Sequence, residues 1–265
     1  MTENSNKTLR PRIAIGFFGI TRSLKWTLPS IQKNIIAPAR ELGETRLFAH
    51  FYQQEHINNP RTGEDQSLNP NEYQLLGCDE IELEQPGNCL ITENYEWILS
   101  HGDAFHDDGK SLANLIHQLH SLQQVGRMMA AWKPDILVMT RPDLMYHDNF
   151  YQVLKDQLKS PSNSLTIPNW QWFGGYNDRF AVCGPVAGFA YANRKDLIKN
   201  YLNKTGGPLP AERFLRFNLH KGRISVKTCS LRASRTRANG TAVDEDFNAA
   251  SLGKYIKRAL TKYFV

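Results

Sequence analysis

The stretch KPDILVMTRPDLMYHD, residues 133 to 148, decides the fold expected for this chain. Its apolar run from Ile136 to Met139 is typical of a short strand buried on both faces. The run ends at Arg141-Pro142-Asp143, where Pro142 lacks a ladder donor and the charged pair must leave the sheet. An arginine and a carboxylate are therefore predicted at the carboxyl end of a central strand, where open α/β sheets bind ligands. The alternative is a charged surface turn.

Strands and helices alternate on both sides of this stretch. Residues 12–18 and 46–51 are apolar and rich in strand formers, and helical periodicity marks residues 24–36 and 111–132. Further strands are expected at 79–83, 164–167, 180–182 and 224–227, and further helices at 150–158 and from 210 onward. Residues 53–72 are polar and contain Pro and Gly, which is typical of a long loop or lid. The pattern predicts an α/β domain.

The loop between the first strand and the first helix offers a second group of ligand candidates. Its sequence, GFFGITRS, places glycine, hydroxyl and arginine side chains where a helix begins, a combination that suits a phosphate. The candidates for contacts to a nucleotide are Gly16, Phe17, Phe18, Gly19, Thr21 and Arg22. The stretch is neither GxGxxG nor a Walker sequence, so a tight turn that requires glycine is the alternative.

Two other elements offer polar side chains to the same region. His50 lies near the end of the second strand, and Asn114 and Gln118 lie one turn apart on the helix at 111–132. These three residues are further candidates for donor binding, whereas a solvated helix edge is the alternative for the two amides.

The segment from 170 to 179 combines several aromatic residues with two glycines. Aromatic rings in an irregular loop either pack in the core or form a platform for a ligand such as a sugar ring. The candidates for acceptor binding are Trp170, Trp172, Tyr176, Asn177 and Arg179. Further on, Pro210 opens a helix and places Glu212 in its first turn.

Charge and cysteine content limit the classes of partner. The formal charge is +6, yet residues 221–265 alone contain ten Lys and Arg against three Asp and Glu. An excess of positive charge confined to one end of the chain favours a local anionic partner over a nucleic acid. Residues 252–264 follow the pattern of a basic amphipathic helix, which either docks on its own domain or lies on an anionic membrane surface. Four cysteines without a CxxC pair, and a polar N-terminal stretch, fit a cytoplasmic protein, peripheral on the membrane if that helix binds lipid.

The order of these parts resembles nucleotide-sugar-dependent glycosyltransferases of the type A (GT-A) fold. The resemblance is carried by RPDL at 141–144, NDRFA at 177–181, GFAYANR at 188–194 and the acidic residue that opens the helix at 210. It implies a mixed central sheet flanked by helices, and a domain over residues 12–228 between a disordered tail at 1–11 and an extension at 229–265. It also implies that GFAYANR forms a strand. The DxD motif of these enzymes is Arg-Pro-Asp here, so one motif carboxylate remains.

The resemblance further implies a function and a set of roles. The chain is expected to move a sugar from a nucleotide-sugar donor to a glycan or lipid-linked acceptor, in surface polysaccharide synthesis. Asp143 is expected to bind Mn²⁺ or Mg²⁺ on the donor diphosphate, unless Arg141 takes the place of the metal. If the transfer inverts the anomeric centre, Glu212 is the first candidate for the base and Asp178 the second. The alternatives are a non-catalytic nucleotide- or carbohydrate-binding protein and another phosphate-handling transferase, such as a sulfotransferase.

Overall fold

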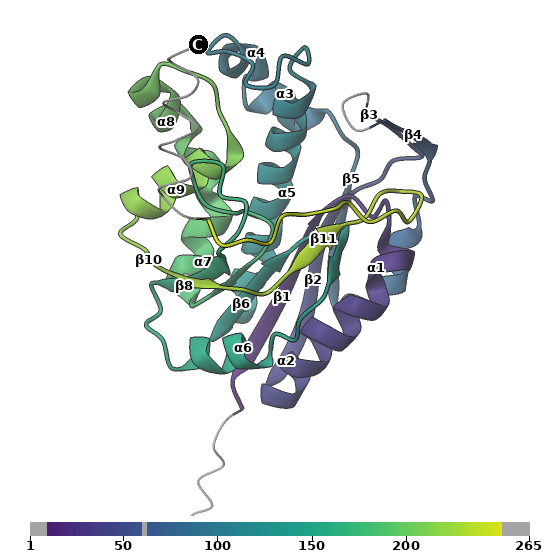
Figure 1. Ribbon diagram of the computed structural model, residues 1–265, viewed down its shortest axis with the longest axis vertical. Helices are drawn as coiled ribbons and strands as arrows, with labels where there is room; N and C mark the ends of the chain where they lie inside the picture. The colour runs from purple at the N-terminus through teal and green to yellow at the C-terminus, as the bar shows by residue number, and fades with distance from the viewer. Residues whose placement is uncertain (1–9, 60–62, 251–265) are drawn as a thin grey trace, which may run out of the picture.

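A seven-stranded, mostly parallel sheet forms the centre of the protein in a computed structural model that describes residues 10–59 and 63–250 (Figure 1). The strand order is β10-β8-β9-β6-β1-β2-β5, and only β9 runs antiparallel to its neighbours. The strands are β1 Arg12–Gly19, β2 Glu44–Tyr52, β5 Glu80–Glu84, β6 Ile136–Thr140, β8 Ser164–Pro168, β9 Ala181–Cys183 and β10 Ser225–Cys229. The predicted α/β class and mixed central sheet are confirmed.

Helices cover both faces of this sheet. They are α1 Leu24–Ile31, the π-helix η1 Gln32–Ile36, α2 Ala37–Leu42, the 3₁₀-helix η3 Glu72–Leu76, α3 Asn88–Thr92, α4 Tyr95–Leu99, α5 Lys110–Trp132, α6 Tyr151–Leu158, α7 Pro185–Ala192, the 3₁₀-helix η4 Asn193–Leu197, α8 Ile198–Thr205 and α9 Ala211–Lys221. α1, η1, α2 and α6 pack on one face, and α5, α7 and α9 pack on the other. None of the described helices is long and apolar enough to cross a membrane.

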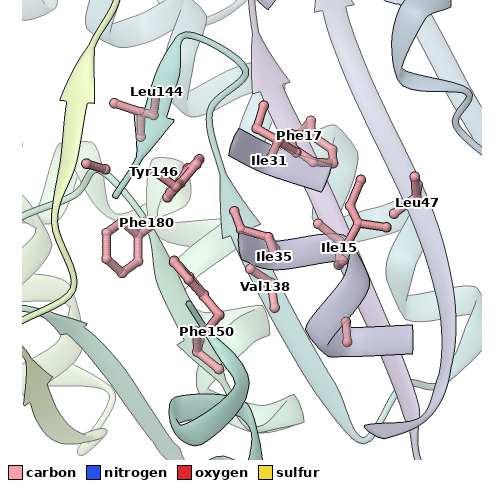
Figure 2. Close-up of a cluster of buried hydrophobic side chains, with 14 of the residues drawn as sticks. Ile15, Phe17, Ile31, Ile35, Leu47, Val138, Leu144, Tyr146, Phe150 and Phe180 are labelled. Carbon is pink, nitrogen blue, oxygen red and sulfur yellow. The ribbon is translucent and has the colours of Figure 1, made fainter. Parts of the chain in front are cut away.

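Strand β1 shows why the sheet needs both helical layers. Ile15 and Phe17 point into the core under α1 and η1, together with Val138 of β6 and Phe150 (Figure 2). Between them in the sequence, Ala14 lies in the second core, under α5 and α7. Successive side chains of a strand alternate between faces, so a strand that is apolar at every position must be covered twice.

The ends of the strands place the loops that carry polar residues. Parallel strands β1, β2, β5, β6 and β8 all end at one edge of the sheet. Because β9 is antiparallel to β6, its first residue, Ala181, pairs with Met139 near the end of β6. The loop before β9, which contains Asp178 and Arg179, therefore lies at the same edge as Arg141 and Asp143.

Residues 230–250 pack against the rest of the protein. The boundary predicted between 228 and 229 falls inside β10, and β11 (Ala233–Arg235) then pairs antiparallel with β7 (Leu144–Tyr146). In Figure 1 this yellow segment crosses the edge of the sheet near the carboxyl ends of the strands. The predicted amphipathic helix at 252–264 and most of the N-terminal tail lie outside the described residues.

Two predictions about local structure are wrong. GFAYANR at 188–194 is the end of α7 and the start of η4, not a strand. Pro185 occupies the start of α7, where the missing N–H of proline costs nothing, and the small residues after it allow close packing on the sheet. The predicted loop at 53–72 contains an antiparallel hairpin, β3 (His56–Asn59) and β4 (Glu64–Ser67), and the 3₁₀-helix η3 begins at its end.

Candidate active site

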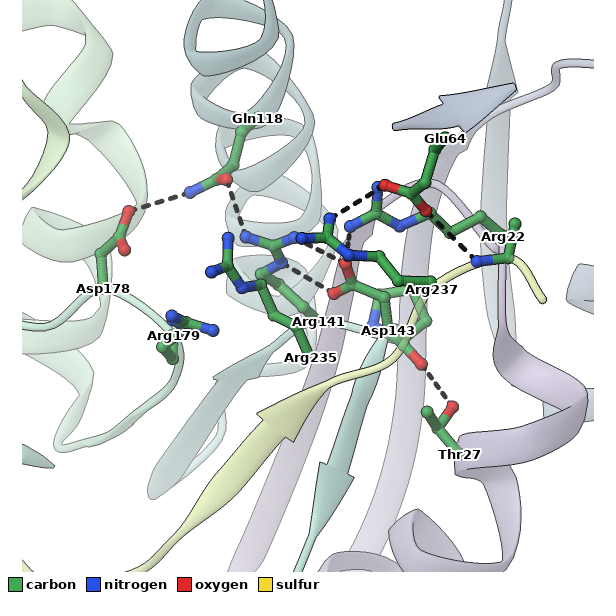
Figure 3. Close-up of polar contacts among 12 residues, drawn as sticks. Arg22, Thr27, Glu64, Gln118, Arg141, Asp143, Asp178, Arg179, Arg235 and Arg237 are labelled. Atoms are coloured by element: carbon green, nitrogen blue, oxygen red, sulfur yellow. Dashed lines mark hydrogen bonds and ion pairs between the residues drawn. The ribbon is translucent and has the colours of Figure 1, made fainter. Parts of the chain in front are cut away.

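Asp143 lies at the centre of a group of arginines at the carboxyl edge of the sheet (Figure 3). Arg141 donates from Nε to Oδ1 over 2.9 Å and from Nη2 to Oδ2 over 2.7 Å, and Arg22 donates from Nη2 to Oδ2 over 2.6 Å. Burial alone would raise the pKa of the Asp143 carboxyl, but the two guanidinium groups hold the pKa well below its usual range. Asp143 is therefore an ionised anchor for Arg22 and Arg141.

Local backbone contacts fix this anchor. Thr27 of α1 donates from Oγ1 to the Pro142 carbonyl over 2.5 Å. On the other side, the Thr236 N–H donates to the Asp143 carbonyl over 2.8 Å. The turn after β6 is thus tied to α1 and to the strand segment that contains β11.

The surroundings of Asp143 do not fit a divalent cation. Both carboxylate oxygens already accept hydrogen bonds from guanidinium groups, and the Asp143 side chain is only 2% exposed. A metal ion on Asp143 would lie beside two fixed positive charges and would have to displace their charge-assisted hydrogen bonds.

The segment around β11 adds two more arginines. Arg237 donates from Nη1 to Glu64 Oε2 over 2.9 Å, and Arg22 donates from Nη1 to the same oxygen over 3.1 Å. Arg235 donates from Nε to Glu245 Oε1 over 3.2 Å. Pairing of β11 with β7 brings these arginines to Asp143, although they lie more than ninety residues away in the sequence.

Arg179 completes what we call the arginine cluster: Arg22, Arg141, Arg179, Arg235 and Arg237 (Figure 3). Arg179 binds both carboxylate oxygens of Glu245, over 2.9 and 3.1 Å. Burial lowers the pKa of the Arg179 guanidinium, and the positive charges of Arg235 and Arg141 lower it further. Five guanidinium groups share the three carboxylates of Asp143, Glu64 and Glu245. An anionic ligand would offset the remaining repulsion.

Gln118 joins the arginine cluster to a second acidic site. It accepts a hydrogen bond from Arg141 Nη1 over 3.3 Å and donates from Nε2 to Asp178 Oδ2 over 3.0 Å. The buried Arg194 lies 3.8 Å from Asp178, and its Nε and Nη2 atoms have no hydrogen-bond partner. The Gln118 side-chain amide thus connects Arg141 to Asp178.

Glu212 lies in the first turn of α9, close enough to Asp178 for the Asp178 charge to act on the Glu212 carboxyl. Burial raises the pKa of Glu212, and the negative charge of Asp178 raises it further, to about 7. The Tyr176 N–H donates to the Glu212 carbonyl over 2.9 Å. A Cβ on Gly175 would lie 1.9 Å from that carbonyl oxygen, so only glycine lets the loop pack on α9. The charge of the second predicted candidate for the catalytic base thus acts on the first.

Several of the predicted donor-binding residues lie elsewhere. The side chains of Phe17 and Phe18 are buried in the two cores, and a Cβ on Gly16 would meet Val125 of α5 at 2.3 Å. The Gly19 N–H donates to the Ser121 hydroxyl and is not available to a phosphate. Thr21 is buried beside Arg22, and Asn114 is exposed on α5 one turn before Gln118. His50 contacts Glu84 and Ser121 instead of the arginine cluster.

The predicted aromatic platform is only partly exposed. Trp170 is fully buried against Phe247 and donates from Nε1 to the Leu231 carbonyl, so its ring offers no face to a ligand. Asn177 is also buried, where it binds the Trp170 carbonyl and the Arg179 N–H. Trp172 and Tyr176 are half-buried, and their rings pack edge to face with centroids 5.2 Å apart. These two rings remain candidates for contacts to an acceptor.

Sequence reasoning missed four charged residues of the arginine cluster and its partners: Glu64, Arg235, Arg237 and Glu245. One signal was present, since Arg235 and Arg237 are two residues apart and a strand places such positions on one face. Nothing in the sequence shows that Glu64, in the hairpin after β2, meets Arg237.

Comparison with known proteins gives a likeness to solved structures only. No protein-family model and no curated protein matches the chain. The chain is similar to mouse xyloside xylosyltransferase 1 in its apo form (10% identity, TM-score 0.45, 83% of this chain and 84% of that one). It is also similar to the galactosyltransferase LgtC in complex with donor and acceptor sugar analogues (11%, 0.44, 82% and 73%) and to the glycosyltransferase GlyE of Streptococcus pneumoniae TIGR4 in its apo form (9%, 0.42, 83% and 45%).

Proposed function

We propose that the chain is a glycosyltransferase that moves a sugar from a nucleotide-sugar donor to a glycan or lipid-linked acceptor. The observation that carries the proposal is the position of the arginine cluster and the Asp178–Glu212 pair at one edge of the sheet. The first group of residues suits an anionic leaving group, and the second suits the removal of a proton from an acceptor hydroxyl.

On the donor side, the chemistry requires neutralisation of the departing nucleoside diphosphate. In this proposal Arg22, Arg141 and Arg237 bind the diphosphate, because guanidinium groups match phosphate geometry and retain their charge. Their own carboxylate partners hold them in place before the donor arrives. Of the two alternatives that the sequence leaves open, we therefore propose the one in which arginine, and not Mn²⁺ or Mg²⁺ on Asp143, neutralises the charge of the diphosphate.

On the acceptor side, Glu212 is the general base. Its carboxylate takes the proton of the acceptor hydroxyl, the acceptor oxygen forms a bond to the anomeric carbon, and the bond from that carbon to the diphosphate oxygen breaks. A base with a pKa of about 7 is half ionised at neutral pH and still basic enough to accept the proton. Asp178 helps because its charge raises the pKa of Glu212. A single displacement of this kind inverts the anomeric centre.

Positive charge and two aromatic rings are the features that would bind the acceptor. The basic balance of residues 221–265 supports an acceptor that carries negative charge, such as a lipid-linked diphosphate. Trp172 and Tyr176 are the rings that a sugar of the acceptor would contact. A role in surface polysaccharide synthesis is part of the same proposal.

Binding of nucleotides tests the donor side first. Thermal unfolding with UDP, GDP, CDP and ADP, each without added metal, should reveal a stabilising nucleotide. Replacement of Arg237 by Gln should weaken binding of that nucleotide by about 10- to 100-fold, since a hydrogen bond to a charged group contributes roughly 1.5–3 kcal/mol. Arg127→Gln is the matched control, because Arg127 is exposed on α5 and forms an ion pair with Glu82, outside the arginine cluster. Equal affinity in Arg237→Gln and the control would contradict the donor site.

A further inference from the structure

A second cluster of polar residues lies apart from the arginine cluster. His50 near the end of β2, Glu84 at the end of β5 and His120 of α5 place their ligand atoms within 4.8 Å of one another. Glu84 Oε2 lies 3.1 Å from His50 Nε2 and 2.9 Å from His120 Nε2. The neighbouring parallel strands β2 and β5 and the helix above them fix these three side chains independently of the proposed donor site.

Hydrogen bonding determines which nitrogen of His50 carries a proton. The Ser121 hydroxyl donates its only hydrogen to the His50 carbonyl over 2.7 Å and accepts one from the Gly19 N–H over 2.9 Å. His50 Nδ1 lies 3.1 Å from the same oxygen, so Nδ1 must be the donor in that contact. In a neutral His50, Nε2 then presents a lone pair toward the Glu84 carboxylate.

Two lone pairs that face each other over 3.1 Å require a positive charge between them. A proton on Nε2 would supply it, as in an ordinary histidine–carboxylate pair. A metal ion is the other cation that satisfies both atoms at once. The Nδ1–H of His50 bound to an oxygen is also the outer contact that metal-bound histidines usually make.

The ligand set and its spacing suit zinc. Two imidazoles and a carboxylate form one of the ligand sets of catalytic Zn²⁺ sites, and ligands 2.0–2.1 Å from a tetrahedral ion lie about 3.3 Å from one another. The observed separations from Glu84 are within a few tenths of an ångström of that value. The side chain of Glu84 is 26% exposed and that of His120 is 15% exposed, so water can reach the fourth position.

Lys195 places a cationic group against this cluster. Its Nζ lies 3.3 Å from His120 Nδ1 and 2.5 Å from Glu93. A lysine that donates to Nδ1 favours the tautomer with a proton on Nε2, which competes with a metal ion for that nitrogen. Lys195 can keep its contact with Glu93 when the metal ion binds His120.

We propose that His50, Glu84 and His120 form a binding site for a divalent transition-metal ion, zinc by its ligand set, with a fourth position open to water. The site is separate from Asp143 and from the donor diphosphate. It ties the ends of β2 and β5 to α5 and leaves one coordination position for a water molecule or an anion.

Metal titration of the full chain tests the proposal. Protein stripped with a chelator and shown to be folded by circular dichroism is titrated with Zn²⁺ alone, and Co²⁺ is added in a parallel experiment to read the coordination from its visible absorption. We expect one Zn²⁺ per chain and a Co²⁺ spectrum of four- or five-coordinate intensity. Glu84→Gln and His120→Ala should weaken Zn²⁺ binding. The loss should exceed the roughly 10- to 100-fold in affinity that removal of an outer-shell contact costs.

Two further variants keep the test decisive if a ligand variant does not fold. His56→Ala is the matched control, because His56 pairs with Asp65 over 2.7 Å on the surface and should leave Zn²⁺ affinity unchanged. Lys195→Gln removes the competing ammonium and should tighten Zn²⁺ binding. The proposal is overturned if wild-type protein takes up no Zn²⁺ at micromolar concentration, if His56→Ala weakens Zn²⁺ binding, or if Lys195→Gln weakens it or leaves it unchanged.

Discussion

Among single residues, Glu212 carries the chemistry of the proposed reaction. Burial and the charge of Asp178 raise its pKa to about 7, so the ionised base becomes available as the pH rises through that value. We expect kcat/KM to increase with pH up to about 7 and then level off. Glu212→Gln should lower kcat by about 10²- to 10⁴-fold, the usual contribution of a general base, and should remove this pH dependence.

A matched carboxylate separates this effect from a general loss of charge. Glu41 is exposed on α2, on the other side of the sheet from α9, and Glu41→Gln should keep both rate and pH profile. Nucleotide affinity should be the same in both variants. A Glu212→Gln enzyme that keeps the pH profile of the wild type would exclude Glu212 as the base.

Asp143 makes the opposite kind of contribution, to stability. Its pKa is lowered by Arg141 and Arg22 in the folded state, so its stabilising effect is complete above the ordinary carboxyl pKa and is lost as the pH falls below it. Asp143→Asn leaves Arg141 without its carboxylate and Arg22 with Glu64 as its remaining one, and loss of one partner of a buried pair costs about 3–5 kcal/mol.

Urea unfolding at pH 7 and at pH 3 measures this contribution. The difference in unfolding free energy between the wild type and Asp143→Asn should be large at pH 7 and smaller at pH 3, where Asp143 of the unfolded chain is protonated. A difference that does not change with pH would show that Asp143 contributes through its shape and not through its charge.

Among the elements, the contact between the 174–178 loop and α9 positions both carboxylates. Gly175→Ala would place a Cβ on the Glu212 carbonyl and push the loop away from α9. We expect a lower Tm and a lower kcat, because Asp178 and Glu212 would separate and the pKa of Glu212 would fall toward its ordinary value. Gly207→Ala is the control, since its Cβ would meet nothing nearer than an oxygen at 4.0 Å. Equal effects of the two substitutions on kcat would contradict this role of the loop.

Periodicity in the sequence predicts most of the elements but not the pairing of distant ones. The apolar runs of β1 and β6 and the long stripe of α5 give strong local signals, and the structure confirms them. The helix that contains GFAYANR is missed because small and aromatic residues suit either conformation and Pro185 was not recognised as its start.

The arginine cluster could be predicted only in part for the same reason. Arg22, Arg141 and Asp143 each follow a strand, so strand order alone brings them together. Arg237 reaches them through the pairing of β11 with β7, two three-residue strands that leave almost no trace in the sequence. Trp170 was misassigned because an aromatic residue in a loop is equally compatible with a buried and an exposed ring.

At the scale of the whole molecule, the two polar clusters make separate predictions about metals. Since Asp143 is held by two guanidinium groups, sugar transfer should not require added Mn²⁺ or Mg²⁺. The assay is best repeated in His120→Ala, which lacks a ligand of the proposed zinc site, so that a chelator acts only on a metal at the donor site. Transfer in this variant should be the same with and without EDTA. If EDTA abolishes transfer and Mn²⁺ recovers it, the metal-independent proposal is wrong and Asp143 binds a metal ion.

Release of a nucleoside diphosphate from a nucleotide sugar is the most direct test of the central claim. Purified protein is incubated with UDP- and GDP-sugars and with lipid-linked or oligosaccharide acceptors, and both the released diphosphate and the glycosylated acceptor are measured by mass spectrometry. We predict stoichiometric release and transfer for one donor in the wild type, and a rate lower by about 10²- to 10⁴-fold in Glu212→Gln. A donor that binds the arginine cluster but is neither transferred nor hydrolysed would contradict the account and leave a nucleotide-sugar-binding protein without catalysis.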